Sequence, residues 1–221
     1  MKKYMRIEYK IPFYGNTKDN THCFQACLKM VLKYFLPNRS FTWKELEEIT
    51  AKVKNLWTWP FAGLSWMSKN GFEVIDIESF DTRRFIKEGE NYLKQKYGQE
   101  VAKEQIKYSD IKQERILAKE FLKNVRFEKK IPQTNEIKQL LKKGYILICN
   151  VNSKALDRKK GYVGHFVVIN GFNKNTFILQ DSGIPPRKNR IVNLSLFEKA
   201  WAYPNEKSRN IMAFNLKRNR F

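Results

Sequence analysis

The sequence predicts an α+β fold, in which an N-terminal helix carrying a cysteine packs on a C-terminal antiparallel β-sheet. Two observations lead to this prediction. Apolar residues recur at helical spacing over Cys23–Phe35. Three compact apolar runs then fall within residues 145–180, and a short polar loop at residues 173–175 separates the last two. Because the helix and the strands would each bury one face, we expect them to share a core.

The first predicted helix, Cys23–Phe35, has a clear beginning and end. Residues 17–21 contain Thr, Asp and Asn, the residue types that cap helix N-termini. Pro37 cannot continue a helix and follows its last residues. Cys23 is therefore expected in the first turn, where the helix N-terminus favours a thiolate.

The other elements follow from capping, breaking and alternation patterns. Thr42 and Glu45 have the spacing of a capping box, and the charged segment that begins at residue 81 is helical in pattern with a break near Gly98. In chain order, the patterns predict helices at residues 42–53 and 63–70, a strand at 72–77, helices within 81–127, a helix from 134 to about 144, strands at 145–151, 165–172 and 176–180, a helix at Leu194–Trp201, and a strand at 211–216.

Composition indicates a globular protein. The chain has 221 residues, of which 42% are hydrophobic and 14% aromatic, and we expect residues 1–221 to form a single domain. The net charge of +21 would attract polyanions and anionic surfaces. Acidic and basic residues alternate through most of the chain, however, and no nucleic-acid-binding motif accompanies them. We expect weak, non-specific binding to anionic surfaces and no specific nucleic-acid partner; the oligomeric state is left open.

Cysteine usage and hydropathy indicate a reducing compartment. Cys23, Cys27 and Cys149 are too few for a disulfide framework. The first ten residues lack the apolar core of a signal peptide, and no apolar run reaches the roughly 18 residues of a membrane span. We therefore expect a cytoplasmic protein without a transmembrane segment.

Three short motifs carry the functional signal. They are IPFYGN at residues 11–16 followed by DNTHCFQACLKMVLKYF at residues 19–35, GHFVVINGF at residues 164–172, and QDSG at residues 180–183. In content and order they resemble the peptidase C39-like family, a branch of the papain-like superfamily of cysteine peptidases. The resemblance covers residues 11–36 and 145–185 and implies a papain-like cysteine peptidase fold. The unmatched segment at about residues 81–130 is predicted to be a charged helical insertion, either a lid or a side subdomain.

The resemblance implies a catalytic triad. Cys23 would be the nucleophile, His165 the base that takes its proton and later protonates the leaving amine, and Asp181 the carboxylate that orients the imidazole. The oxyanion would be bound by the backbone N–H of Cys23 and by Asn16, which takes the place of the family's Gln. His165 lies 142 positions after Cys23, within the roughly 130–150 that separate the two residues in papain-type sites. The implied activity is cysteine-dependent hydrolysis of a peptide or protein substrate through a thioester, with no cofactor.

Two residues depart from the family pattern. Phe24 replaces the Gly that follows the nucleophile, and we expect its large side chain to narrow or close part of the cleft. Asn16 is shorter than Gln, and Asn20 is a second, weaker candidate for the oxyanion donor. Loss of one such donor typically costs about 2.7–4 kcal/mol of transition-state stabilisation, so this replacement matters.

Other interpretations stay open. Cys23 alone could be an ordinary half-buried helix cysteine, His165 a core histidine, and Asp181 a turn-capping carboxylate. The chain could then be a catalytically silent papain-like binding protein, or a basic adaptor for nucleic acid or anionic surfaces. Cys27 and Cys149 are expected in the core and His22 in solvent. The aromatic residues 57–61 fit either the core or a cleft, and the sparse His and Cys residues do not favour a metal site.

Overall fold

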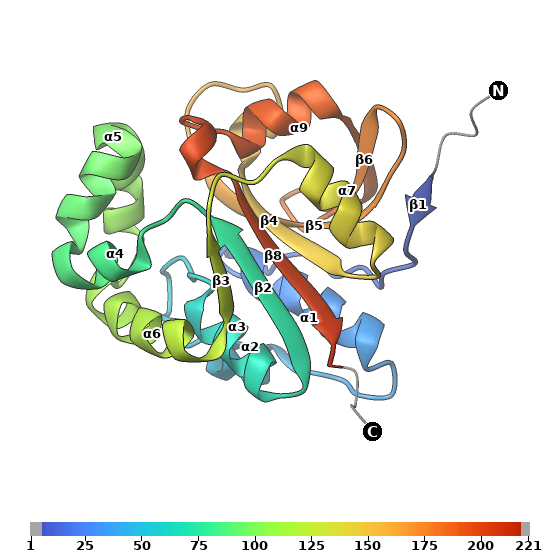
Figure 1. Cartoon of the computed structure of the whole chain (residues 1–221), viewed down its shortest axis with the longest axis horizontal. Coiled ribbons are helices and arrows are strands. Elements are labelled where there is room, and N and C mark those ends of the chain that lie inside the picture. Colours follow the sequence, from blue (N-terminus) through green and yellow to red (C-terminus); the bar gives the residue numbers. More distant parts are fainter. Residues whose placement is uncertain (1–5, 218–221) are drawn as a thin grey trace.

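The computed structural model describes residues 6–217, in which a mixed eight-stranded β-sheet lies between two layers of helices (Figure 1). The strands are β1 (Ile7–Glu8), β2 (Phe72–Glu78), β3 (Arg126–Lys129), β4 (Ile146–Asn152), β5 (Gly164–Phe172), β6 (Thr176–Asp181), β7 (Arg187–Asn193) and β8 (Asn210–Leu216). Their order is β3-β2-β8-β4-β5-β6-β7, and β1 pairs with the end of β5. All pairs are antiparallel except β2 with β3.

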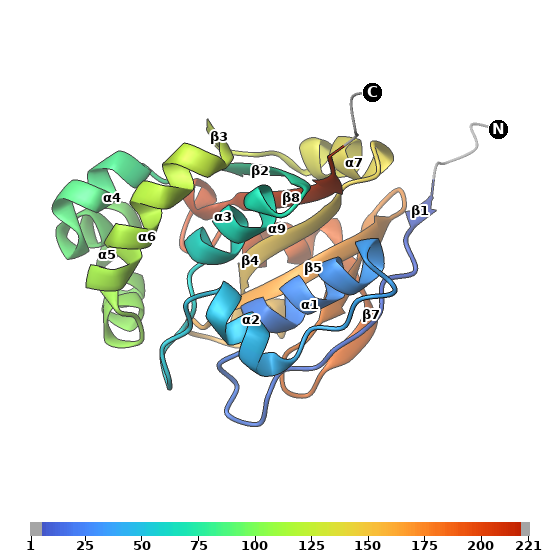
Figure 2. The same cartoon turned by 90° about the horizontal axis from the view of Figure 1, so that it is seen from below.

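The helices cover both faces of this sheet. They are α1 (Cys23–Phe35), α2 (Trp43–Ile49), α3 (Phe61–Lys69), α4 (Thr82–Glu88), α5 (Glu90–Lys107), α6 (Ile111–Asn124), α7 (Thr134–Lys142), α8 (Ser153–Leu156), α9 (Leu194–Trp201) and the 3-10 turn η1 (Glu206–Ser208). Helices α1 and α3 bury apolar residues against one face, and α7 and α9 against the other (Figure 2). The predicted α+β fold, with a cysteine-bearing helix packed on the sheet, is confirmed.

Helix α1 begins and ends where the sequence predicts. It packs against β5 and buries the residues that recur at helical spacing. Helix α2 ends at Ile49, earlier than the predicted residue 53, although its capping box forms: Thr42 Oγ1 accepts from the Glu45 amide (3.2 Å) and Glu45 Oε2 accepts from the Thr42 amide (2.7 Å).

The segment between Asp81 and Asn124 is helical as predicted and lies beside the sheet, at the edge formed by β2 and β3 (Figure 1). Asp81 and Asp110 cap α4 and α6 through their side chains. Gly98 has φ 77° and ψ 171°, which breaks α5 at the predicted residue. No helix within residues 6–217 combines the length and the apolar character needed to cross a membrane.

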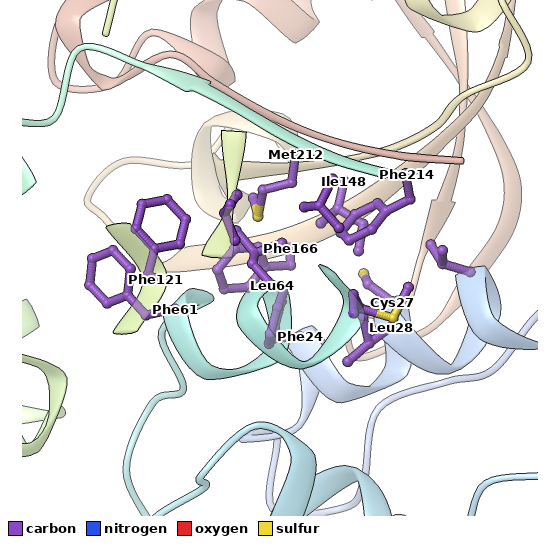
Figure 3. Close-up of a cluster of buried hydrophobic side chains, with 14 of the residues drawn as sticks. Phe24, Cys27, Leu28, Phe61, Leu64, Phe121, Ile148, Phe166, Met212 and Phe214 are labelled. Atoms are coloured by element: carbon purple, nitrogen blue, oxygen red, sulfur yellow. The ribbon is translucent and has the colours of Figure 1, made fainter. Parts of the chain in front are cut away.

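The large side chain of Phe24 is accommodated in the core. It is fully buried, and its ring lies 4.9 Å from that of Phe166, centroid to centroid (Figure 3). Gly63 on α3 leaves room for it, because a Cβ atom at this position would approach Phe24 Cε1 to 2.8 Å. Cys23 meanwhile stays half-buried as a residue and lines the cleft.

Replacing Gly63 with Ala should therefore destabilise the protein by about 1 kcal/mol. Overpacking a core costs about 1–3 kcal/mol, which exceeds the roughly 1 kcal/mol that Ala gains over Gly inside a helix. Urea denaturation of the wild type, Gly63→Ala, Phe24→Leu and the double variant measures the effect. In the Phe24→Leu background the sign should reverse, because the smaller side chain removes the clash. An equal cost in both backgrounds would contradict the proposed contact.

Candidate active site

A cleft with a volume of about 240 Å³ opens where α1 begins and β5 begins. Cys23, His165 and Asp181 line it together with the aromatic segment at residues 57–61 and parts of β2, β4 and β8. Cys23 is the first residue of α1, His165 is the second residue of β5, and Asp181 is the last residue of β6. The structure thus brings the three predicted triad residues to one place.

His165 lies between the other two side chains. Its Nε2 atom is 2.8 Å from Asp181 Oδ1, and both side chains are only 6% exposed. The pairing of Val167 with Asp181 makes His165 and Asp181 diagonal neighbours on adjacent strands. Cys23 forms a hydrogen bond with His165. Because Nε2 faces Asp181, the other ring nitrogen, Nδ1, is the one available to the thiol.

Asp181 is itself held by two further donors. Arg190 Nη1 donates to Asp181 Oδ2 (2.7 Å), and the Gly183 amide donates to Oδ1 (3.0 Å). Arg190 also donates through Nη2 to Asp157 Oδ1 (2.8 Å) and to the carbonyl oxygen of Leu156 (2.7 Å), which fixes the guanidinium. Burial opposes ionisation of Asp181, but His165 and Arg190 outweigh it and hold the pKa of this carboxyl well below its usual range.

These contacts favour a charged pair at the thiol. Burial disfavours the thiolate of Cys23, yet the hydrogen bond and the charge of His165 lower the pKa of Cys23 below its ordinary value. Burial likewise opposes the imidazolium, but Asp181 and Cys23 raise the pKa of His165 to about 10. The arrangement therefore favours a thiolate next to an imidazolium. Cys27 and Cys149 are buried as predicted, and burial raises the pKa of both.

The oxyanion candidates take different places. Asn16 Oδ1 accepts from the backbone amides of Thr17 (2.9 Å) and His22 (2.8 Å), and Asn16 Nδ2 donates to Asn20 Oδ1 (2.9 Å). Asn16 thus organises the loop before α1, whereas Asn20, with φ 57°, lines the cleft beside Cys23. Asn16 stays the predicted donor to the oxyanion. Asn20, the second candidate, lines the cleft, whereas Asn16 does not.

The prediction that His22 points to solvent is wrong. His22 is 6% exposed; its Nε2 atom lies 2.7 Å from Glu47 Oε1 and its Nδ1 atom 2.7 Å from Thr17 Oγ1. Its ring also contacts Trp43 edge-on, with centroids 5.8 Å apart. Glu47 and Trp43 belong to α2, so the burial of His22 depends on the packing of α2 against α1, which the local sequence does not reveal.

Arg190 is the residue of the candidate site that the sequence patterns missed. It lies on β7, whose sequence RKNRIVN has mostly exposed side chains and too few apolar residues to indicate a strand. A charged strand at the edge of a sheet has no clear alternation signal, so nothing in the sequence connects Arg190 with Asp181. Among residues 6–217, no three His, Cys, Asp or Glu side chains are grouped as they would be around a metal ion.

Three solved structures with a similar fold are described as a protease, a peptidase domain and a putative peptidase. A double glycine motif protease from an AMS/PCAT transporter, in complex with its leader peptide, matches with a TM-score of 0.50 at 13% identity, covering 95% of this chain and 94% of that one. The peptidase domain of Streptococcus ComA, described as a bi-functional ABC transporter involved in quorum sensing, has a TM-score of 0.49 at 15% identity over 95% and 99% of the chains. A putative C39-like peptidase from Bacillus anthracis has a TM-score of 0.47 at 14% identity over 97% and 98%.

The likeness to the first of these structures confirms the predicted papain-like fold of C39-like peptidases. The family is shown by a sequence model described as guanylylate cyclase, which matches residues 16–205. The chain therefore belongs to this family. No curated protein matches it.

The contact between Asp181 and His165 predicts a specific pH dependence of Cys23 alkylation. In the wild type, iodoacetamide should modify Cys23 at lower pH than an ordinary thiol, because its pKa is lowered, and Cys27 and Cys149 should react far more slowly. Asp181→Asn removes the charge that favours the imidazolium. The alkylation rate of Cys23 should then begin to rise only at higher pH. Peptide mass spectrometry of samples alkylated across pH 5–10 measures this rate.

Asp157→Asn is the matched control for this substitution. Asp157 also binds Arg190 but has no contact with His165, so its removal should leave the Cys23 profile nearly unchanged. Equal shifts in the two variants would show that the charge network around Arg190, and not the bond to His165, sets the thiol pKa.

Proposed function

We propose that this protein is a cysteine-dependent hydrolase of peptide or amide bonds. The observation that carries the proposal is the hydrogen-bonded row of Cys23, His165 and Asp181 at the wall of a cleft. A nucleophile, a base and a residue that orients the base are the minimum set for this chemistry. The C39-like fold supports the same class of reaction, and the leader peptide bound to one structural neighbour supports a peptide as substrate.

The reaction would proceed in two steps. The Cys23 thiolate attacks the substrate carbonyl carbon, and the resulting oxyanion is stabilised by the backbone N–H of Cys23 and an amide of Asn16 or Asn20. The C–N bond breaks as the His165 imidazolium gives its proton to the leaving amine, which leaves a thioester on Cys23. Water then attacks the thioester, with its proton passing to His165. The C–S bond breaks, releasing the carboxylic acid and restoring the thiolate and the imidazolium.

Asp181 would act as a positioning residue. Its bond to Nε2 fixes the ring so that Nδ1 faces the sulfur, and its charge stabilises the imidazolium. Arg190 in turn fixes the carboxylate, so the orientation of the ring rests on two successive contacts, His165 with Asp181 and Asp181 with Arg190, that link β5 to β7.

The lowered pKa of the Cys23 thiol favours a hydrolase over the alternative functions. A catalytically silent binding protein has no need of a lowered thiol pKa at a partly exposed cysteine, and the Phe24 ring that could have blocked the cleft packs in the core instead. A basic adaptor is motivated only by the net charge of +21. The cyclisation of a guanine nucleotide, suggested by the family's description, would use a hydroxyl of the nucleotide as nucleophile and would not require Cys23.

A proteome-derived peptide mixture tests the proposal without a known substrate. Peptides made with a glutamate-specific protease, which leaves Arg and Lys inside them, are incubated with the protein, and new termini are quantified by mass spectrometry. Cys23→Ala should abolish cleavage, and His165→Asn should lower it by about 10²–10⁴-fold, the usual contribution of a general acid–base.

Matched substitutions control for folding in this experiment. Cys27→Ala and His22→Asn change the same residue types next to the site and should retain cleavage. Thermal melting verifies that each variant folds. Cleavage that survives in Cys23→Ala, or cyclic nucleotide formed from GTP by wild type and Cys23→Ala alike, would refute the thiol mechanism.

A further inference from the structure

The cleft extends from the thiol to a second region that is rich in hydrogen-bond acceptors. We call this region the acidic arm and define it by six cleft-lining residues: Asp76, Glu78, Tyr97, Gln105, Tyr162 and Ser208. Strands β8 and β4 separate β2, which carries the two acids, from β5, which carries His165. The strand register places Glu78 about level with Phe166, so three inter-strand steps of about 4.8 Å put it roughly 14 Å across the sheet from His165, and Asp76 lies two residues farther along β2. This distance of roughly 14 Å equals about four residues of an extended peptide.

The two acids occupy positions where the strand pattern calls for apolar residues. Phe72 and Val74 point into the core beneath α1, and Asp76 and Glu78 continue the same alternation on β2. Ile75 and Ile77, on the opposite face, are buried in the other core cluster. Acidic residues that replace core residues break a local folding rule, and such exceptions are expected at functional sites.

The carboxylates have no partners in the described part of the chain. Asp76 is 3% exposed, and the side-chain oxygens of Asp76 and Glu78 accept no hydrogen bond and form no ion pair with any residue in 6–217. The nearest cation, Lys96, attracts Glu78 only at a distance, because its Nζ atom donates to Ser79 Oγ (2.9 Å) and to the carbonyl oxygen of Lys207 (2.9 Å). A buried acid without a partner is costly, and a bound cation would remove that cost.

Other orphaned oxygens in the arm support the same kind of ligand. Gln105 donates to the Tyr162 hydroxyl, which leaves Gln105 Oε1 buried with no partner among the described residues. Ser208 Oγ is buried and unpartnered in the same part of the structure. Tyr97 lies close enough to Glu78 to interact with it electrostatically. Carboxylates, an amide oxygen and aromatic rings together suit a cation with several N–H donors.

We propose that the acidic arm binds the cationic side chain of an arginine or lysine in the peptide substrate, about four residues from the bond that is cleaved. This inference rests on the proposed function, since it assigns substrate specificity to the same cleft. It also gives the helical segment at about residues 81–130 a role, because α5 supplies Tyr97 and Gln105. When ionised, the two acids would attract a basic segment to a protein whose overall charge is +21.

Binding to the inactive Cys23→Ala protein tests the arm separately from catalysis. The probes are acetylated, amidated alanine nonapeptides with one Arg, Lys, citrulline or norleucine placed at each position in turn. Citrulline and norleucine match Arg and Lys in size but lack the charge. Affinities are measured by calorimetry at pH 8, since burial raises the pKa of Glu78 to about 7 and that of Asp76 well above its usual value.

At one position, the Arg or Lys peptide should bind about ten- to hundredfold tighter than its neutral counterpart, as a charge-assisted contact in a buried site predicts. Comparing Arg with Lys identifies the preferred cation. Asp76→Asn and Glu78→Gln should each remove the preference. Glu73→Gln, which makes the same change on β2 outside the cleft, should retain it. Because two variants of the acidic arm are measured, the test can still be read if one of them does not fold.

Three results separate the arm from the thiol site. Equal binding of charged and neutral peptides would refute cation binding by the acidic arm. If Cys23 in the wild type is still alkylated as predicted, the proposed hydrolase activity would not be affected by that result. A charge preference without Cys23 reactivity would support the arm and refute the hydrolase. Tighter binding of GTP than of any cationic peptide, lost in Asp76→Asn, would overturn the arm as a peptide subsite and assign it to a nucleobase.

Discussion

The hydrogen bond between His165 and Asp181 is the contact on which the candidate site depends. It joins two side chains from adjacent antiparallel strands whose register places them diagonally, and it leaves the second imidazole nitrogen for the thiol of Cys23. The carboxylate does not rely on the histidine alone, because Arg190 and the Gly183 amide hold it as well. The charged state of the site therefore follows from backbone register, and not from flexible surface contacts.

The rest of the fold supplies that register and positions the sulfur. Strand β5 is paired on both sides, and α1 packs along it, so the start of the helix has a fixed place next to the start of the strand. Phe24 anchors this end of α1 by filling the space above Phe166 that Gly63 leaves free (Figure 3). A residue that departs from the pattern of C39-like peptidases thus contributes to the core, and the thiol next to it keeps its access to the cleft.

The sequence predicted the parts of the structure whose signals are local. Helical spacing and the flanking breakers identified α1 to the residue, and the motifs around Cys23, His165 and Asp181 predicted three side chains that the fold brings together. It did not predict β3, β7 or the burial of His22, because charged edge strands lack alternation and the partners of His22 lie on α2. The acidic residues of β2 were assigned to a strand, but only the tertiary structure places their side chains in the cleft.

The protonation state of His165 tests the central claim most directly. The chain has only two histidines, so ¹⁵N-labelled imidazole resonances are assigned by comparison with His165→Asn. If His165 lies between a thiolate and a carboxylate, both of its ring nitrogens will stay protonated through neutral pH and titrate only near pH 10. Loss of a ring proton near pH 6.5, as in an ordinary histidine, would contradict the account.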